Sequence, residues 1–204
     1  MTRIIGGAAG SLTLAVPRSG TRPTSDRVRE AIFSALDARG GLDGLRVLDL
    51  YAGSGALGLE ALSRGAATVT LVERNAGAAR VARQNAATVE RAVRAAGTAT
   101  DAAPARVDVA AQAVQQYLRG LPVVPGAGFD VVFLDPPYEL DETELGADLE
   151  LLVPLLDPDA TVLVERSSRS PGPRWPRGLE LDRSKAYGET VLWWASPTTP
   201  SAEG

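Results

Sequence analysis

The chain has 204 residues, a net charge of −4, and neither Cys nor His. This length suits one α/β domain with a substantial core, and the missing residue types exclude disulfides, thiolate nucleophiles, Cys/His zinc sites and histidine bases. No apolar run is long enough to cross a membrane and no secretory signal opens the chain, so we expect a cytoplasmic protein whose chemistry uses a bound cofactor and no metal.

The charges are unevenly distributed along the chain. Residues 1–46 carry seven Arg against four acids, residues 130–165 carry eleven acids and no base, and residues 166–187 carry six bases against two acids. The acidic total argues against a general nucleic-acid binder, but two basic segments could flank an anionic substrate.

The first 45 residues predict a small hairpin and a helix. Short strands are expected at residues 3–7 and 11–16, on either side of a Gly/Ala turn. In PTSDRVREAIFSALDARGG, Thr24 or Ser25 is the expected N-cap, and the helix is expected to stop at the glycine pair 40–41. Its apolar stripe starts at Val28 and leaves Arg27 and Arg29 outside, so we expect the helix to dock on a sheet with its charged side open.

From residue 46 onward, short apolar runs alternate with helical patterns, which is typical of βαβ units and a parallel sheet. The expected strands are residues 47–51, 68–73, 106–109, 131–135 and 161–165, with an edge strand at 190–195. The expected helices are residues 56–64, 76–96, 111–118 and 142–152. We therefore divide the chain into an N-terminal extension (1–45), a main domain (46–196) and a flexible tail (197–204).

The stretch DLYAGSGALGLE, residues 49–60, contains a glycine pattern typical of nucleotide-binding loops. Gly53, Gly55 and Gly58 fit G-x-G-x-x-G, and Glu73 follows at a spacing suited to a ribose-binding acid. A tight strand-to-helix turn beside an ordinary surface Glu would give the same letters. The pattern alone does not separate NAD from other adenosyl ligands.

The tetrapeptide Asp135-Pro136-Pro137-Tyr138 follows an apolar strand. Its prolines fix φ and remove two backbone donors, which leaves the Asp135 carboxylate and the Pro136 carbonyl as acceptors. Such a pair suits an exocyclic amine, and Tyr138 offers a face on which a base can stack; a rigid turn with Tyr138 packed outside is the structural alternative. Because ligands bind at the carboxyl ends of parallel strands, we expect four acids to converge on one rim: Asp49, Glu73, Asp108 and Asp135.

Together, DLYAGSG, VER and DPPY resemble S-adenosylmethionine-dependent methyltransferases that modify amines. With RIIGG, RPTSDRVREAIFSAL and the late YGETVL, the chain resembles the RsmD family over nearly its whole length. That resemblance implies a Rossmann-like class I methyltransferase: a mostly parallel, seven-stranded twisted sheet with helices on both faces, plus an N-terminal β-hairpin and helix. It also implies methylation of N2 of one guanine in bacterial 16S ribosomal RNA.

The resemblance also implies residue roles. The cofactor, S-adenosyl-L-methionine, would contact Asp49, Tyr51, Gly53, Gly55, Glu73, Arg74, Asp108, Val109 and Asp135. Glu73 would bind the ribose hydroxyls, and Asp108 with the Val109 backbone would hold adenine. The catalytic group would be Asp135 and Pro136, which grip the guanine amine, with Tyr138 stacked on the ring. RNA contacts would come from Arg3, Arg18, Arg22, Thr24, Arg27, Arg29, Pro137 and Tyr138. The family usually has basic residues just after GG, where this chain has Ala8-Ala9-Gly10-Ser11.

The expected partner is 16S RNA within a 30S particle or assembly intermediate, because an acidic chain without a separate recognition domain should bind bare RNA weakly. We expect a monomer. Three alternatives stay open: an NAD-dependent oxidoreductase, a non-catalytic RNA-binding factor, and an amino-methyltransferase acting on DNA adenine or a protein amide.

Overall fold

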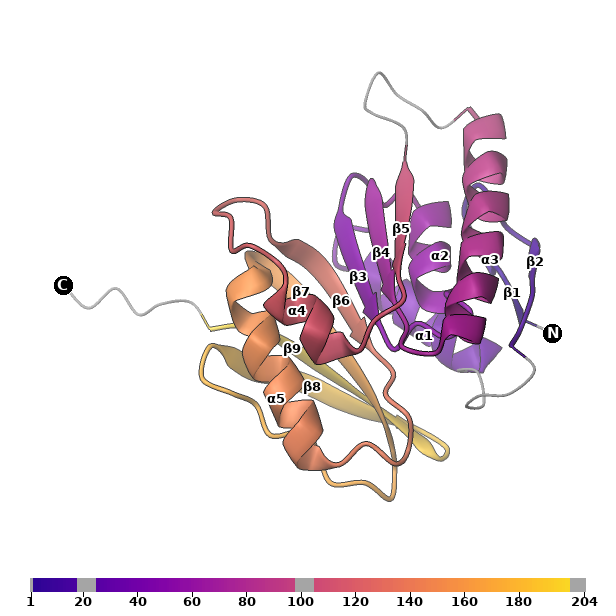
Figure 1. The fold of residues 1–204 in the computed structure, drawn as a ribbon. Coiled ribbons are helices and arrows are strands. Elements are labelled where there is room, and N and C mark those ends of the chain that lie inside the picture. The colour runs from indigo at the N-terminus through magenta and orange to yellow at the C-terminus, as the bar shows by residue number, and fades with distance from the viewer. Residues whose placement is uncertain (1, 18–24, 98–104, 199–204) are drawn as a thin grey trace.

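The computed structural model describes residues 2–17, 25–97 and 105–198. Within them, the central sheet contains seven strands: β3 (Arg46–Leu50), β4 (Thr68–Val72), β5 (Arg106–Ala110), β6 (Phe129–Leu134), β7 (Leu156–Ser167), β8 (Leu179–Tyr187) and β9 (Thr190–Pro197). Their order across the sheet is β5-β4-β3-β6-β7-β9-β8 (Figure 1). The first five are parallel to one another, and β9 is antiparallel to both β7 and β8. The strand order reverses between β3 and β6, where open α/β sheets bind their ligands.

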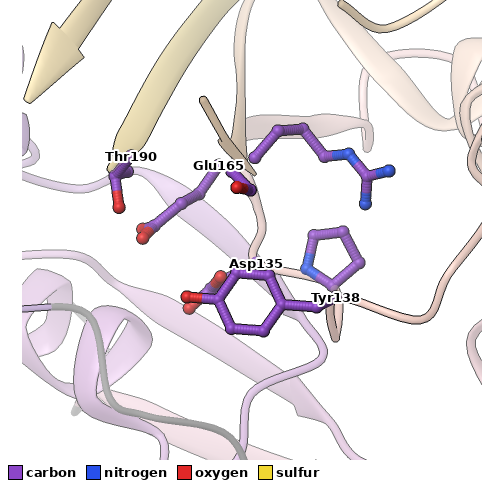
Figure 2. Close-up of a pocket in the computed structure, with 7 residues that line it drawn as sticks. Asp135, Tyr138, Glu165 and Thr190 are labelled. Atoms are coloured by element: carbon purple, nitrogen blue, oxygen red, sulfur yellow. The ribbon is translucent and has the colours of Figure 1, made fainter. Parts of the chain in front are cut away.

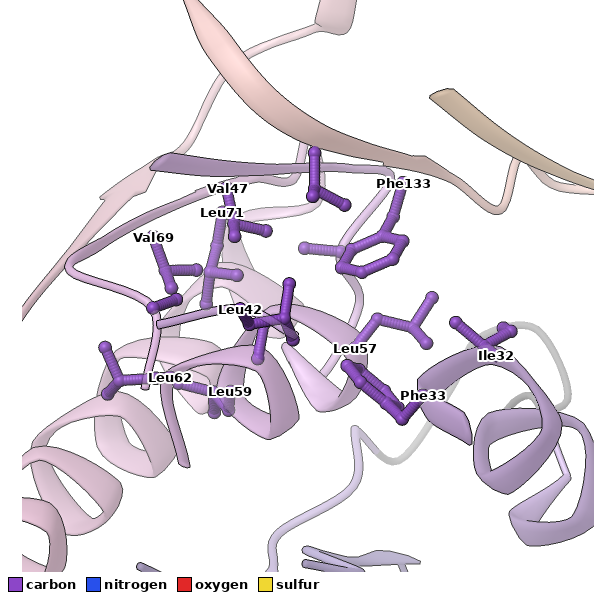
Figure 3. Close-up of a cluster of buried hydrophobic side chains, with 14 of the residues drawn as sticks. Ile32, Phe33, Leu42, Val47, Leu57, Leu59, Leu62, Val69, Leu71 and Phe133 are labelled. Carbon is purple, nitrogen blue, oxygen red and sulfur yellow. The ribbon is translucent and has the colours of Figure 1, made fainter. Parts of the chain in front are cut away.

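Helices cover both faces of this sheet (Figure 1). One face carries α1 (Asp26–Asp37), α2 (Ala56–Ser63) and α3 (Ala76–Ala95), and the other carries α4 (Val114–Arg119) and α5 (Glu142–Leu152), which continues into the short 3₁₀ helix η1 (Val153–Leu155). Successive strand residues point to opposite faces, so Phe133 joins the first core while Val132 and Leu134 join the second. Figure 3 shows Ile32 and Phe33 of α1 beside Phe133 in the first core. The strands are apolar on both faces because both faces are covered.

The N-terminal hairpin packs on the end of α2. Its strands, β1 (Thr2–Arg3) and β2 (Thr13–Leu14), are shorter than the predicted ones. The buried Glu60 carboxylate accepts hydrogen bonds from the N–H groups of Ile5 and Gly6, at 2.6 and 2.8 Å. At Gly7, which has φ of +73°, a Cβ would lie 1.9 Å from the Ser63 carbonyl oxygen. The Gly-Gly pair therefore allows the turn to lie against α2, at the amino-terminal end of the sheet.

The fold class predicted from the sequence is confirmed, with differences in the last third of the chain. The strand at Thr190–Pro197 is internal and not at the edge, because β8 lies outside it. The sequence does not predict β8. Its residues 180–186 are all exposed, so no buried face requires apolar residues at alternate positions. β9 runs to Pro197, one residue into the predicted tail, and residues 199–204 lie outside the described part of the chain. None of the described helices is long and apolar enough to span a membrane.

Candidate active site

A tight turn joins β3 to α2 at the carboxyl end of the sheet. Tyr51, Gly53 and Gly55 all have positive φ, of 65°, 55° and 82°. The turn is held by the Ala52 N–H, which donates to the Val72 carbonyl at 3.0 Å, and by the Gly55 N–H, which donates to the Ala52 carbonyl at 2.7 Å. These left-handed conformations turn the chain from strand to helix within a few residues.

The three glycines of this loop have different roles. A Cβ at Gly53 would meet no atom within 4 Å, whereas at Gly55 and Gly58 it would lie 2.8 and 2.5 Å from methyl groups of Leu71. Gly55 and Gly58 are therefore required for close packing of α2 on β4. Gly53 is the loop glycine beside open space, where a ligand has room to approach.

Asp49, Glu73 and Asp135 lie close together at this rim. The Asp49 carboxylate is buried and accepts a hydrogen bond from the Gly58 N–H at 2.9 Å. Burial raises the pKa of Asp49 to about 7, and the nearby charges of Asp135 and Glu73 add to that rise. Glu73 is fixed in turn, because its two oxygens accept from the N–H groups of Gly53 at 3.0 Å and Asn75 at 2.7 Å. Three of the four predicted acids thus converge.

Asp108 does not join them. It lies opposite Thr70 within β5, two residues before the strand ends at Ala110. Its carboxylate is exposed and forms an ion pair with Arg106 at 2.5 Å. The expectation that Asp108 reaches the rim is therefore wrong, because the strand continues past it. The next residue, Val109, accepts a hydrogen bond from Arg83 through its carbonyl at 3.3 Å.

A hollow of about 340 Å³ opens at the same rim, on the α4 and α5 side. Two of the predicted cofactor residues line it, Tyr51 and Arg74, together with Val114, Leu140 and Asp148. The Tyr51 hydroxyl donates a hydrogen bond to the buried Asp148 carboxylate, and burial raises the pKa of both groups. Asp148 was not found by sequence reasoning, since an acid inside an amphipathic helix gives no signal of burial.

The DPPY segment lines a second, smaller hollow (Figure 2). Asp135 and Tyr138 lie on one side of it, and Glu165 and Thr190, from β7 and β9, lie on the other. Pro136 is buried, whereas Tyr138 is 63% exposed and is among the most exposed large hydrophobic residues of the described chain. The turn after Tyr138 is closed by the Leu140 N–H, which donates to the Pro137 carbonyl at 3.0 Å. An exposed ring beside fixed acceptors can receive a planar, amine-bearing group.

Arg166 fixes this turn from behind. Its buried guanidinium pairs with Glu142 and donates to the Leu140 carbonyl at 3.1 Å. The sequence does not single out Glu165 or Arg166, which lie near the end of β7, because only the pairing of β7 with β6 brings them to the DPPY segment.

The predicted RNA contacts at the N-terminus have different surroundings. Arg3 and Arg27 are exposed, and Arg3 lies 4.0 Å from Asp26. Arg18, Arg22 and Thr24 lie outside the described residues. Arg29 is fully buried and its guanidinium pairs with Asp26 at 2.6 Å, so the expectation that it lies on an open, RNA-facing side is wrong. Phe33, four residues after Arg29, is buried as well, so the buried face of α1 is wider than the predicted apolar stripe and includes Arg29.

This sheet and rim define a Rossmann-like class I methyltransferase. A family model described as Conserved hypothetical protein 95 matches residues 2–196. The ribosomal RNA small subunit methyltransferase D of Escherichia coli is 37% identical over 190 residues, which cover 93% of this chain and 86% of that protein. YlbH of Bacillus subtilis is 35% identical over 191 residues, covering 92% and 95%. The solved structure of yhhF from Escherichia coli has a TM-score of 0.76 and 30% identity, covering 97% of this chain and 98% of that one. The chain belongs to the RsmD family of ribosomal RNA methyltransferases.

Proposed function

We propose that this protein transfers a methyl group from S-adenosylmethionine to the exocyclic N2 amine of a guanine in bacterial 16S ribosomal RNA. The observation that carries the proposal is the position of the DPPY hollow beside the glycine turn. The hydrogen-bond acceptors that suit an amine lie at the same rim of the sheet as the glycine turn that we expect to bind the cofactor. Within the described residues, no group of Cys, His, Asp and Glu could hold a metal ion.

The residues at this rim fit the cofactor. Gly53 leaves space above the turn, and Glu73 is held where its carboxylate can accept ribose hydroxyls. The hollow lined by Tyr51 and Arg74 offers both apolar and polar walls for the adenosyl half. Three neighbouring carboxylates, Asp49, Glu73 and Asp135, favour a cationic ligand. When bound, S-adenosylmethionine supplies an electrophilic methyl group on a sulfonium and leaves as S-adenosylhomocysteine.

The chain's own residues activate the amine. The guanine N2 lone pair is delocalised into the ring, so the free amine is a poor nucleophile. Asp135 and the Pro136 carbonyl would accept its two hydrogens, which favours a pyramidal nitrogen and stabilises the positive charge that develops there. Tyr138 would stack on the ring and hold the nitrogen in line.

A paired base cannot enter this hollow, so the target guanine must be unpaired or flipped out. Among the described residues near the N-terminus of α1, few arginines are exposed, so the basic surface there is small. The net charge of the chain is −4. Both features support a structured small-subunit particle, and not bare RNA, as the substrate of a monomeric enzyme.

Mapping of modified guanines in 16S RNA by mass spectrometry tests the proposal. A strain that lacks this gene should miss one N2-methylguanine, and the purified protein with S-adenosylmethionine should restore it on isolated 30S particles. Asp135→Ala should abolish the transfer while calorimetry still detects cofactor binding. Binding of NAD in place of S-adenosylmethionine, or an unchanged set of methylguanines, would overturn the proposal. Equal rates on bare RNA and 30S particles would contradict the particle as substrate.

A further inference from the structure

We propose that Glu165 selects guanine, by accepting a hydrogen bond from the N1–H of the base whose N2 amine Asp135 holds. This inference rests on the proposed function and adds a residue that reads the identity of the base. It starts from the DPPY hollow, where a second carboxylate faces Asp135 (Figure 2).

The sheet register places the two acids side by side. Leu134 of β6 pairs with Val164 of β7 in a parallel ladder, so Asp135 and Glu165 are the next residues on neighbouring strands. Such strands lie roughly 4.8 Å apart. The side chains two residues earlier, Phe133 and Leu163, belong to the same core. Alternation therefore directs both carboxylates toward the same face of the sheet.

The next strand adds a hydroxyl beyond Glu165, offset by two residues along β7. β9 pairs with β7 so that Leu192 is opposite Glu165 and Thr190 is opposite Ser167. Thr190 lines the hollow on the same side as Glu165 (Figure 2). Across β6, β7 and β9, the side chains thus follow the order Asp135, Glu165, Thr190.

This order matches one edge of guanine. Along that edge stand the N2 amine, the N1–H and the O6 atom, which are donor, donor and acceptor. Asp135 and Glu165 provide carboxylate acceptors for the first two, and the Thr190 hydroxyl can donate to O6. In adenine and cytosine, the ring nitrogen beside the amine is an acceptor. The Glu165 carboxylate would then face a lone pair, which disfavours both bases.

The experiment compares two bases at the target position. Reconstituted 30S particles carry either guanine or 2-aminopurine at the mapped site of their 16S RNA; 2-aminopurine keeps the N2 amine but has an N1 acceptor and no O6. The wild type should prefer guanine by about 100-fold in kcat/KM. Glu165→Gln presents an amide that can donate to N1, so its preference should fall about 10-fold or more. A purely structural role of Glu165 would lower both rates and leave the ratio unchanged.

Glu189→Gln is the matched control. It removes a carboxylate in the turn between β8 and β9, where Glu189 is 76% exposed and pairs with Arg169, and it should leave the ratio unchanged. Glu165→Ala provides a second variant if Glu165→Gln folds poorly, and its ratio should fall as well. An unchanged ratio in folded Glu165 variants that bind S-adenosylmethionine overturns the inference alone. A wild type that methylates neither RNA nor 30S particles overturns the proposed function instead.

Discussion

The Asp49 carboxylate and the Gly58 N–H are joined by a hydrogen bond of 2.9 Å that links the end of β3 to the first turn of α2. Both residues are buried, and a Cβ at Gly58 would lie 3.3 Å from the Asp49 Cβ. The glycine thus lets the helix approach the strand, and the acid satisfies a helix N–H that has no partner within the helix. The two together fix the turn that we propose holds the cofactor.

Asp49→Asn should remove a pH dependence of stability. The pKa of Asp49 is about 7 in the folded protein against 3.8 for an unperturbed Asp, so the folded state binds the proton more tightly. Stability from this residue is therefore lost as pH rises from about 4 to about 7. Between about pH 5 and pH 8 the wild type should lose up to about 3 kcal/mol more than Asp49→Asn. Urea unfolding at both pH values measures this difference, and parallel losses in the two proteins would contradict it.

Gly58→Ala should destabilise the protein by about 1–2 kcal/mol. The added methyl would lie 2.5 Å from Leu71 Cδ2 and 2.8 Å from Val69 Cγ1, and this overpacking outweighs the helix propensity of Ala. Gly146→Ala in α5 is the matched control, because no atom lies within 4 Å of its Cβ position. That variant should gain about 0.5–1 kcal/mol. Thermal unfolding of both variants checks the opposite signs.

Glu60→Gln should loosen the N-terminal hairpin. Glu60 accepts from Ile5, Gly6 and, at 2.8 Å, from Arg64 Nε, so a side-chain amide would turn a donor toward other donors. We expect a loss of about 2–4 kcal/mol, because the site is buried and charged. Hydrogen exchange should speed up first at residues 4–12. The exposed Glu30→Gln should change neither quantity, and slow exchange of the hairpin in Glu60→Gln would refute this role.

Arg29→Ala and Arg27→Ala should separate stability from RNA binding. Arg29 is fully buried and pairs with Asp26, so its loss should cost about 1–3 kcal/mol of stability and leave the affinity for 30S particles unchanged. Arg27 is exposed at the start of α1, so its loss should weaken that affinity and leave the unfolding temperature unchanged. Filter binding at two salt concentrations and thermal unfolding measure the two effects. Weaker RNA binding by folded Arg29→Ala would contradict the assignment.

Tyr138→Ala should lower kcat/KM for methyl transfer by about 10- to 100-fold, because stacking on a base contributes about 1–3 kcal/mol. Tyr138→Phe keeps the ring and should retain activity within about threefold. Since the side chain is 63% exposed, neither change should alter the unfolding temperature noticeably. Equal activity of the Ala and Phe variants would show that the ring does not stack on the substrate.

Much of the fold is determined locally and is therefore visible in the sequence. Helix α5 has the predicted bounds, Glu142–Leu152, since an N-cap at Asp141 and a regular apolar pattern define it. The glycine turn and the DPPY segment also follow from local backbone constraints: positive φ at Gly53 and Gly55, and proline rings at 136 and 137. The family resemblance added the seventh strand, which no local pattern contained, and the strand order came from the structure.

Tertiary structure decided what depends on neighbours distant in the sequence. Whether Arg29 is open or buried depends on what packs around α1, and whether Asp108 reaches the rim depends on how far β5 continues. Glu165 gave no signal of its own, because its position beside Asp135 follows only from the pairing of β7 with β6. The sequence by itself thus determined the family, the glycine turn and the amine acceptors, whose chemistry is carried by adjacent residues. The guanine-selecting edge we propose was decided by strand register, which brings together residues thirty positions apart.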